Sequence, residues 1–486
     1  MSPAPRVVVV GAGITGLTAA FTIMTRTPQV DVTVLEAADR VGGKVLTTPF
    51  AGRPVDCGAD AFLARVPEAI ELCEELGLDT VLTSPARRSA LVYSGGALRR
   101  LPEGLVLGVP TDLDALAGSG IVSPDAVVRA SADVDTTEWL PGEPSGDPLA
   151  DGDESVGTLV RRRLGDEVFE RLVAPLLSGV NAGDADHLSV AAGAAQIGAA
   201  ARRHPSLVVG LRQQTADARA AGADPEAPVF RGIPVGTQTL TDLLLARLVA
   251  GGASVHLSSA VTALDHRLTD GGARSGWTLR TEHGVVDADA VVLAVPAPVA
   301  ARVLHDHAAD AAAGLAELEY ASVAMVTLAV PLDRIERDLD ASGFLVARGE
   351  GLAALTACSW ASSKWAHLAD PDVAVLRVSA GRHGDTGALE LDDPELVRVL
   401  TGDLAATMGV DGPPVAARVT RWPDGLPQFR PGHLGRVAAW RDEVADRAPG
   451  VVLAGASYDG LGLPACIRQG RVAAADAARQ ALDATR

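Results

Sequence analysis

The chain has 486 residues, which is long enough for two or three packed units with large cores. Hydrophobic residues make up 48% of it and exclude a disordered protein, while a formal net charge of −19 argues against nucleic-acid binding through a broad basic surface. The cysteines are scattered without a C-x-x-C pair, so neither a disulfide framework nor a metal site is expected at Cys57, Cys73, Cys358 and Cys466.

The first predicted element is a short buried strand, Val7–Val10, made of four β-branched residues. A G-x-G-x-x-G pattern follows it and opens an Ala-rich helix, with its glycines at Gly11, Gly13 and Gly16. In that context the glycines permit a tight turn, close approach of a pyrophosphate and close helix packing, with the phosphates at the helix N-terminus. A second strand over 32–35 ends at Glu36, where a carboxylate can bind a ribose hydroxyl. The alternative is a βαβ unit whose glycines serve packing alone.

The residues after Glu36 discriminate between nicotinamide and flavin. Positions 37–44 read A-A-D-R-V-G-G-K and resemble the E-x-x-x-R-x-G-G-[RK] extension of the FAD-dependent amine oxidase superfamily. This resemblance implies FAD, with Glu36 on the adenosine ribose and Arg40 and the glycine pair along the phosphates and flavin. Positions 56–59, D-C-G-A, resemble the family's next element, a turn near the isoalloxazine ring.

Further elements follow in chain order. Apolar spacing predicts a helix over 67–78, paired β-prone runs predict a hairpin over 91–101, and the pattern from 111 to 219 is mainly helical around a polar loop at 141–154. The remaining predicted elements are a helix at 166–177, a helix at 239–250, strands at 254–257 and 260–264, one near-continuous strand at 285–296, β-rich runs at 322–330 and 373–379, a strand at 451–456 and a closing helix at 470–482.

The predicted fold class is therefore α/β and α+β. We expect a discontinuous Rossmann-like FAD-binding domain, a mixed-sheet substrate domain and a helical insertion. Their expected boundaries are 1–85, 228–297 and 430–486 for the FAD-binding domain, 86–110 and 298–429 for the substrate domain, and 111–227 for the insertion.

Three segments resemble signatures of one family within that superfamily, the porphyrinogen oxidases. Residues 163–184 resemble R-x-G-x-E-x-x-x-x-L-x-x-P-x-x-x-G-[IV]-[YF]-A-G-[DN], residues 360–365 resemble W-x-S-S-K-[WF], and residues 454–470 resemble G-x-S-Y-x-G-x-G-[IVL]-P-x-C-I. The resemblance runs in order from Val7 to Ala475. It departs from the pattern at Asn181, where the family commonly has an aromatic residue.

The resemblance implies a set of cofactor-binding residues. They are Gly11, Ala12, Gly13, Ile14, Thr15, Gly16, Glu36, Ala37, Arg40, Gly42, Gly43, Lys44, Gly58, Ala59, Asp60, Val261, Trp422, Gly455, Ala456, Leu463, Pro464 and Ile467. No side chain is assigned a catalytic role, because hydride transfer belongs to the flavin.

The resemblance implies fewer substrate residues: Arg65, Gly179 and Asn181. Arg65 matches a region of basic residues that face substrate propionates; the alternative is a solvent-facing arginine. Gly179 could let the chain pass close to a flat macrocycle, or serve a turn without ligand contact. Lys364 either supports the flavin or makes a structural ion pair.

The function implied is FAD-dependent oxidation of a porphyrinogen, with O2 as acceptor and H2O2 formed. Coproporphyrinogen III, with four propionates, is favoured over protoporphyrinogen IX, with two, because the chain lacks an evident amphipathic membrane patch and resembles the soluble type of Gram-positive bacteria and actinobacteria. Two readings from other classes are a flavin amine oxidase, which would not need residues 163–184, and a non-catalytic FAD-binding protein.

Partners and location follow from the same considerations. The longest uncharged apolar stretch of note, 188–201, is too short to span a membrane. We expect a cytoplasmic monomer or homodimer that binds neither nucleic acid nor metal. A reactive porphyrin product is better handed on than released, and ferrochelatase is the expected recipient.

Overall fold

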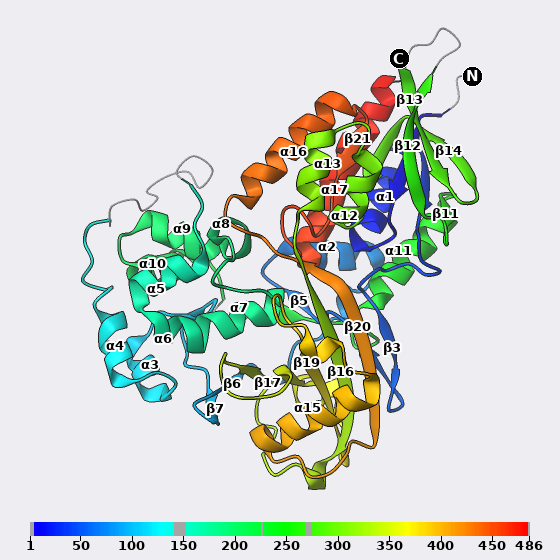
Figure 1. The fold of residues 1–486 in the computed structure, drawn as a ribbon. Coiled ribbons are helices and arrows are strands. Elements are labelled where there is room, and N and C mark those ends of the chain that lie inside the picture. Colours follow the sequence, from blue (N-terminus) through cyan, green and yellow to red (C-terminus); the bar gives the residue numbers. More distant parts are fainter. Residues whose placement is uncertain (1–3, 140–151, 225–226, 269–273, 485–486) are drawn as a thin grey trace.

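The computed structural model describes residues 4–139, 152–224, 227–268 and 274–484. Within these residues a five-stranded parallel sheet has the order β11–β2–β1–β15–β21 (Figure 1). Its strands come from distant parts of the chain: β1 (Arg6–Val10), β2 (Asp31–Leu35), β11 (Ser254–His256), β15 (Ala290–Leu293) and β21 (Val451–Leu453). The discontinuity expected for the Rossmann-like unit is thus confirmed.

The central strand β1 serves two hydrophobic cores, one on each face of the sheet. Val7 and Val9 belong to a core with α1 (Ile14–Arg26), α2 (Pro67–Leu76), α11 (Gln238–Ala250) and α17 (Leu463–Ala484). Val8 and Val10 belong to a second core with α12 (Ala297–Leu304), α13 (Ala309–Ala316) and α16 (His433–Arg447). Because side chains alternate along a strand, burial on both faces explains the unbroken apolar run.

The single strand expected over 285–296 is wrong. The chain forms β14 (Gly284–Ala288), pairs it in an antiparallel sheet with β12 (Val261–Leu268) and β13 (Arg274–Thr281), and only then enters the parallel sheet as β15. The break falls at Asp289, which is buried, pairs with Arg267 and accepts a hydrogen bond from the backbone N–H of Arg6 at 2.7 Å. Asp289, held by these two partners, therefore divides the predicted strand into β14 and β15, which belong to different sheets.

A second, mixed sheet has the order β20–β16–β19–β18–β17–β6–β7 and lies below the first in Figure 1. Neighbours pair antiparallel except β17 and β6, which pair parallel. Its strands are β6 (Leu91–Ser94), β7 (Ala97–Arg100), β16 (Tyr320–Pro331), β17 (Gly343–Val346), β18 (Leu355–Trp360), β19 (Val373–Ala380) and β20 (Ala416–Pro427). The predicted hairpin and the mixed sheet are confirmed, and α15 (Asp393–Met408) packs on this sheet.

A mainly helical part with its own core lies to the left in Figure 1. Its helices are α3 (Leu113–Ser119), α4 (Pro124–Ser131), α5 (Val156–Leu164), α6 (Asp166–Val168), α7 (Ala174–Asn181), α8 (Val190–Gly193), α9 (Ala195–Arg203) and α10 (Leu207–Ala220). A π-helical stretch, Phe169–Val173, joins α6 to α7, so the helix expected over 166–177 runs on to Asn181. Most of the expected loop at 141–154 lies outside the described residues.

Short elements complete the connections between these parts. They are β3 (Thr47–Phe50), β4 (Arg53–Asp56), β5 (Phe62–Leu63), β8 (Leu105–Val106), β9 (Val109–Pro110), β10 (Phe230–Arg231) and α14 (Ala361–Lys364). The predicted fold class is confirmed, whereas the exact domain boundaries remain predictions. None of the helices in the described ranges is both long and apolar enough to cross a membrane.

One buried carboxylate joins α15 to the mixed sheet and yields a stability prediction. Asp403 accepts hydrogen bonds from the backbone N–H groups that lead into β18: those of Ala353 at 2.9 Å, Ala354 at 2.8 Å and Leu355 at 2.9 Å. Asp403→Asn puts an amide donor against these donors and should lower the free energy of unfolding by about 2–3 kcal/mol. Urea denaturation checks this against the exposed control Asp372→Asn, and equal midpoints for the two variants would contradict it.

Candidate functional site

The glycine turn after β1 contains two packing glycines and one open position. Gly11 has φ +100°, and a Cβ there would lie 2.5 Å from the oxygen of Ala294. A Cβ at Gly16 would lie 1.9 Å from the oxygen of Gly11. At Gly13 a Cβ would meet no described atom within 4 Å. In the described chain no side chain caps α1 here, so its first N–H groups are available to phosphate oxygens.

Glu36 lies beside this turn at the carboxyl end of β2. Its carboxylate accepts hydrogen bonds from the backbone N–H groups of Ala12 at 2.6 Å and Ala38 at 2.9 Å. An ionised carboxylate has about four acceptor sites, so capacity remains for a ribose hydroxyl. The Ser259 N–H donates to the backbone oxygen of Glu36 at 2.7 Å, which brings the start of β12, at Val261, close to this edge.

A second glycine turn closes onto the first. The Gly42 N–H donates to the oxygen of Ala12 at 2.8 Å, and Gly42 and Gly43 have φ values of +99° and +56°. Arg40 donates from Nη1 to the oxygen of Val41 at 3.0 Å and from Nη2 to that of Gly43 at 2.5 Å. Arg40 therefore shapes its own turn, and its expected place along the phosphates remains a prediction.

The turn over 57–59 is held at its carbonyl groups by donors from three separate elements. These bonds are Trp422 Nε1 to Cys57 at 3.0 Å, Arg377 Nη2 to Gly58, and Thr237 Oγ1 to Ala59 at 2.9 Å. A Cβ at Gly58 would lie 2.6 Å from the oxygen of Lys44, so the two segments touch there. The turn is thus fixed relative to the mixed sheet and to the start of α11, which packs on the parallel sheet.

Asp60, next in the chain, has a side chain that is 17% exposed and surrounded by cationic and N–H donors. Its carboxylate accepts hydrogen bonds from Lys364 Nζ and Trp365 Nε1, both at 2.9 Å, and pairs with Arg377 Nη1 at 2.9 Å. Burial alone would raise the pKa of Asp60, but Lys364 and Arg377 lower it, so the carboxylate stays ionised. Of the two roles considered for Lys364, the structure shows the ion pair.

The turn after β21 provides a second open glycine. Gly455 has φ +133°, and a Cβ there would meet none of the described atoms within 4 Å. Gln469 Oε1 accepts a hydrogen bond from its N–H at 3.3 Å. A Cβ at Gly470 would lie 2.5 Å from the oxygen of Thr15, so α17 packs directly on α1. The turns at Gly13 and Gly455 therefore both follow strands of the parallel sheet at its carboxyl edge, where nucleotides bind in such sheets.

The other predicted cofactor residues lie on the same segments. Ile14 and Thr15 open α1, Ala37 follows Glu36, Ala456 follows Gly455, and the buried Leu463, Pro464 and Ile467 begin α17. Lys44 lies with its Nζ 5.9 Å from the ring centre of Tyr320. The open backbone at two glycines, the uncapped helix start and the carboxylate of Glu36 together fit FAD.

Each of the three predicted substrate residues has a contact of its own within the protein. A Cβ at Gly179 would lie 2.8 Å from Leu345 Cδ2 on β17, so this glycine permits close packing. Asn181 is buried, and its Nδ2 donates to the oxygen of Leu177 in its own helix at 3.2 Å. Arg65 is exposed and donates to Gln196 Oε1 on α9 at 3.3 Å. Their contacts with substrate remain predictions.

Sequence reasoning missed Thr237, Trp365 and Arg377 as residues of the site. Arg377 had a detectable signal, because a charged residue interrupts the apolar run V-A-V-L-R-V-S-A of β19. Its side chain is only 5% exposed, and a buried arginine needs an anionic partner. The partner, Asp60, lies 317 positions earlier in the chain, so pattern alone did not identify it.

Two glycine variants separate ligand approach from packing. Gly13→Val should leave the unfolding temperature within a few degrees of wild type, because its backbone is extended and its Cβ faces open space. It should weaken FAD binding at least about 100-fold, because the side chain fills the space that the pyrophosphate needs. Gly16→Ala should lower both the unfolding temperature and the affinity for FAD. Flavin absorbance after gel filtration and thermal denaturation measure them, and a Gly13→Val protein that keeps its flavin would contradict the assignment.

The Asp60 ion pairs predict a pH-dependent loss of stability. Asp60→Asn leaves Lys364 and the buried Arg377 without their anion and should lower the free energy of unfolding by about 3–5 kcal/mol at pH 7. Because the pKa of Asp60 is lower in the folded than in the unfolded protein, its stabilisation is complete above about pH 4 and is lost as the pH falls. The difference in free energy of unfolding between the variant and wild type should therefore become smaller toward pH 3.

The control Asp265→Asn breaks an exposed pair with Arg280 and should change the free energy of unfolding by less than about 1 kcal/mol. If the difference between Asp60→Asn and wild type stays constant with pH, the charge of Asp60 is not the source of the stabilisation.

Known proteins share this arrangement along nearly the whole chain. The family model described as "Flavin containing amine oxidoreductase" matches residues 14–478. A coproporphyrinogen III oxidase of Bacillus subtilis is 34% identical over 481 residues, covering 97% of each chain. One of Mycobacterium leprae is 37% identical over 462 residues, covering 94% of this chain and 95% of the relative. A crystal structure from Exiguobacterium sp. 255-15 has a TM-score of 0.85 and 30% identity, covering 98% of this chain and 99% of that one. The chain therefore belongs to the coproporphyrinogen III oxidase family of the flavin-containing amine oxidoreductases.

Proposed function

We propose that this protein oxidises coproporphyrinogen III to coproporphyrin III with bound FAD, using O2 as the acceptor and forming H2O2. The observation that carries this proposal is the end-to-end similarity to coproporphyrinogen III oxidases, combined with an FAD-compatible pair of open glycine turns. FAD supplies the hydride-accepting chemistry and the passage of electrons to O2. Aromatisation of the macrocycle drives the reaction, so the protein mainly orients the reactants and excludes water.

The residues around the turn over 57–59 do this positioning. Trp422, Arg377 and Thr237 hold its carbonyl groups, and the ion pairs of Asp60 anchor the next residue. These contacts keep the turn over 57–59 at a fixed distance from the bound flavin. Fixed placement matters because small displacements of the reacting atoms lower the rate by large factors.

Tyr320 supports the other expected flavin-binding turn, the one after β21. Its hydroxyl accepts a hydrogen bond from the Ala297 N–H at 2.9 Å and lies 2.7 Å from Ser457 Oγ, in the turn after β21. The start of β16 is thereby tied to the second open glycine turn. Burial raises the pKa of Tyr320, so its hydroxyl stays protonated at neutral pH and serves as a hydrogen-bonding group rather than an anion.

Several finer features belong to this proposal. Arg65, Gly179 and Asn181 face the macrocycle, and residues 111–227 form an insertion between segments of the FAD-binding and substrate domains. The protein works in the cytoplasm as a monomer or homodimer and passes its porphyrin to ferrochelatase. What supports the hand-over is chemical: free porphyrins are photoreactive, so direct transfer limits damage.

Parallel assays with coproporphyrinogen III and protoporphyrinogen IX test the function. The FAD-loaded protein should show a kcat/KM at least about ten-fold higher for coproporphyrinogen III, followed by porphyrin fluorescence and O2 consumption, because each properly bound extra carboxylate contributes about that factor. The flavin-free Gly13→Val protein and a protein-free sample correct for spontaneous oxidation.

The other outcomes are equally informative. A reversed preference would identify a protoporphyrinogen IX oxidase. A protein that binds flavin but oxidises neither substrate would contradict the proposal and restore the amine oxidase reading.

A further inference from the structure

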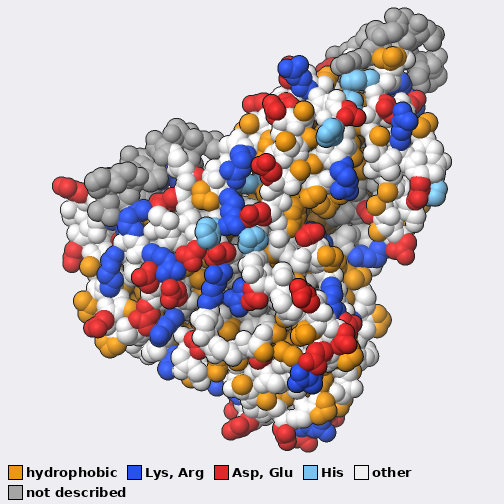
Figure 2. All heavy atoms as spheres, viewed as in Figure 1, with side chains coloured by type: hydrophobic (Ala, Val, Ile, Leu, Met, Phe, Trp, Pro, Cys, Tyr) orange, Lys and Arg blue, Asp and Glu red, His pale blue; other side chains and the backbone are white. Residues whose placement is uncertain are grey.

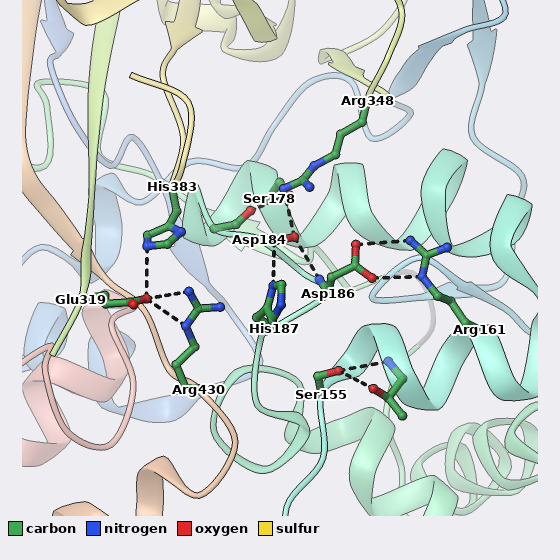
Figure 3. A network of polar contacts seen from close by, with 12 residues as sticks. Ser155, Arg161, Ser178, Asp184, Asp186, His187, Glu319, Arg348, His383 and Arg430 are labelled. Carbon is green, nitrogen blue, oxygen red and sulfur yellow. Dashed lines mark hydrogen bonds and ion pairs between the residues drawn. The ribbon is translucent and has the colours of Figure 1, made fainter. Parts of the chain in front are cut away.

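Arginine and histidine side chains gather where the helical part meets one end of the mixed sheet. We call them the arginine–histidine cluster: His187 after α7, Arg348 after β17, Arg382 and His383 after β19, and Arg430 after β20. Figure 2 shows basic and histidine side chains over the middle of this face. In Figure 3, His187, Arg348, His383 and Arg430 lie around two carboxylates, Asp184 and Glu319.

The first carboxylate, Asp184, holds part of the cluster in place. Arg348 Nη2 lies 3.0 Å from Asp184 Oδ1, and His187 Nδ1 lies 2.8 Å from Oδ2. Burial alone would raise the pKa of Asp184, but the hydrogen bond from His187 and the charge of Arg348 lower it. Asp184 is therefore an anion that orients Arg348 while occupying only one of its two terminal nitrogens in the described structure.

The second carboxylate, Glu319, neutralises Arg430. Arg430 donates to Glu319 Oε2 from Nε at 2.9 Å and from Nη2 at 2.6 Å, and His383 Nε2 lies 3.2 Å from the same oxygen. The hydrogen bond from Arg430 and its charge lower the pKa of Glu319. Glu319 therefore balances the charge of Arg430.

Arg382 differs from these arginines because it is less exposed and poorly partnered. Its side chain is 17% exposed, and the nearest carboxylate oxygen recorded among the described residues is Asp385 Oδ2, 3.7 Å from its Nε. That Nε is buried and has no hydrogen-bond partner in the part of the chain that the structure describes. Burial and the nearby charge of Arg348 lower the pKa of Arg382. Arg348 and Arg382 follow β17 and β19, which lie on either side of β18 and end at the same edge of the mixed sheet. An incoming anion stabilises two guanidinium groups placed in this way.

The cluster adjoins the segments assigned to substrate and flavin. The His383 N–H donates to the backbone oxygen of Ala182 at 2.8 Å, inside the 179–184 stretch. Glu319 directly precedes Tyr320, whose hydroxyl lies 2.7 Å from Ser457 Oγ beside the second open glycine turn. A macrocycle placed along these segments would carry its substituents toward the cluster.

We propose that Arg348 and Arg382 form an anion subsite that takes a propionate carboxylate of the porphyrinogen. This proposal rests on the proposed function and deepens it. The guanidinium groups have unused donors in a fork that matches a carboxylate, and Asp184 presets the orientation of Arg348. Such a subsite favours a macrocycle with four propionates over one with two, because more orientations of the former place a carboxylate beside Arg348 and Arg382.

Binding of the product measures the subsite without turnover. Coproporphyrin III and its uncharged tetramethyl ester are titrated into the FAD-loaded protein while porphyrin fluorescence is recorded. Arg348→Gln and Arg382→Gln should each weaken binding of the free acid about 10- to 100-fold and leave binding of the ester within about two-fold. Arg398→Gln, which breaks an exposed pair with Glu395 on α15, is the matched control and should change neither. In turnover, the two variants should raise KM for coproporphyrinogen III far more than they lower kcat.

The outcomes separate this proposal from the function on which it rests. Variants that bind the free acid as tightly as wild type overturn the subsite and leave the function standing. Equal losses for acid and ester indicate a structural role and also overturn the subsite. A wild-type protein that neither binds coproporphyrin III nor oxidises its porphyrinogen overturns both. Should Arg382→Gln fail to fold, the more exposed Arg348→Gln decides the question.

Discussion

The buried contacts of Asp60 with Lys364 and Arg377 tie the cofactor turn to the mixed sheet, and the geometry of the site depends on them. Asp60 belongs to the turn beside the expected flavin ring, whereas Lys364 ends α14 and Arg377 lies in β19. An ion pair in a low-dielectric interior costs desolvation and is retained only with well-placed partners. Arg377 also donates a hydrogen bond to the backbone oxygen of Gly58, so one side chain both balances the charge of Asp60 and fixes the position of the turn.

The parallel sheet imposes a second constraint, which is long-range closure. Its strands come from five separated stretches, and α17 at the end of the chain packs on α1 near its beginning. Gly470 allows this approach, because a Cβ there would collide with the backbone oxygen of Thr15. A complete cofactor site thus requires both ends of the chain, and loop-closure entropy must be overcome before it forms.

The negative net charge of the chain does not exclude an anionic substrate. The chain carries a net charge of −19, yet arginines and histidines gather beside the segments assigned to substrate. At physiological ionic strength the global field is screened within about 8 Å, so a multiply anionic substrate responds chiefly to nearby cations. Asp184 and Glu319 orient those cations, and Arg382 remains the one with the poorest compensation among the cluster's described arginines.

The sequence by itself determined the cofactor, the family and the main elements. The glycines at 11, 13 and 16, the carboxylate at Glu36 and the turn over 56–60 lie at short spacings whose geometry is set by the local backbone, so they could be identified before any contact was known. Only the tertiary structure decided which distant side chains complete the site. Thr237, Trp365 and Arg377 contact the turn over 57–59 or Asp60 from positions far along the chain. Arg382 comes near Arg348 because β17 and β19, on either side of β18, end at the same edge of the mixed sheet. It also decided where Asp289 divides an apolar run into two strands that belong to different sheets. Such contacts form between residues far apart in the sequence, and they leave no local periodic pattern from which they could be predicted.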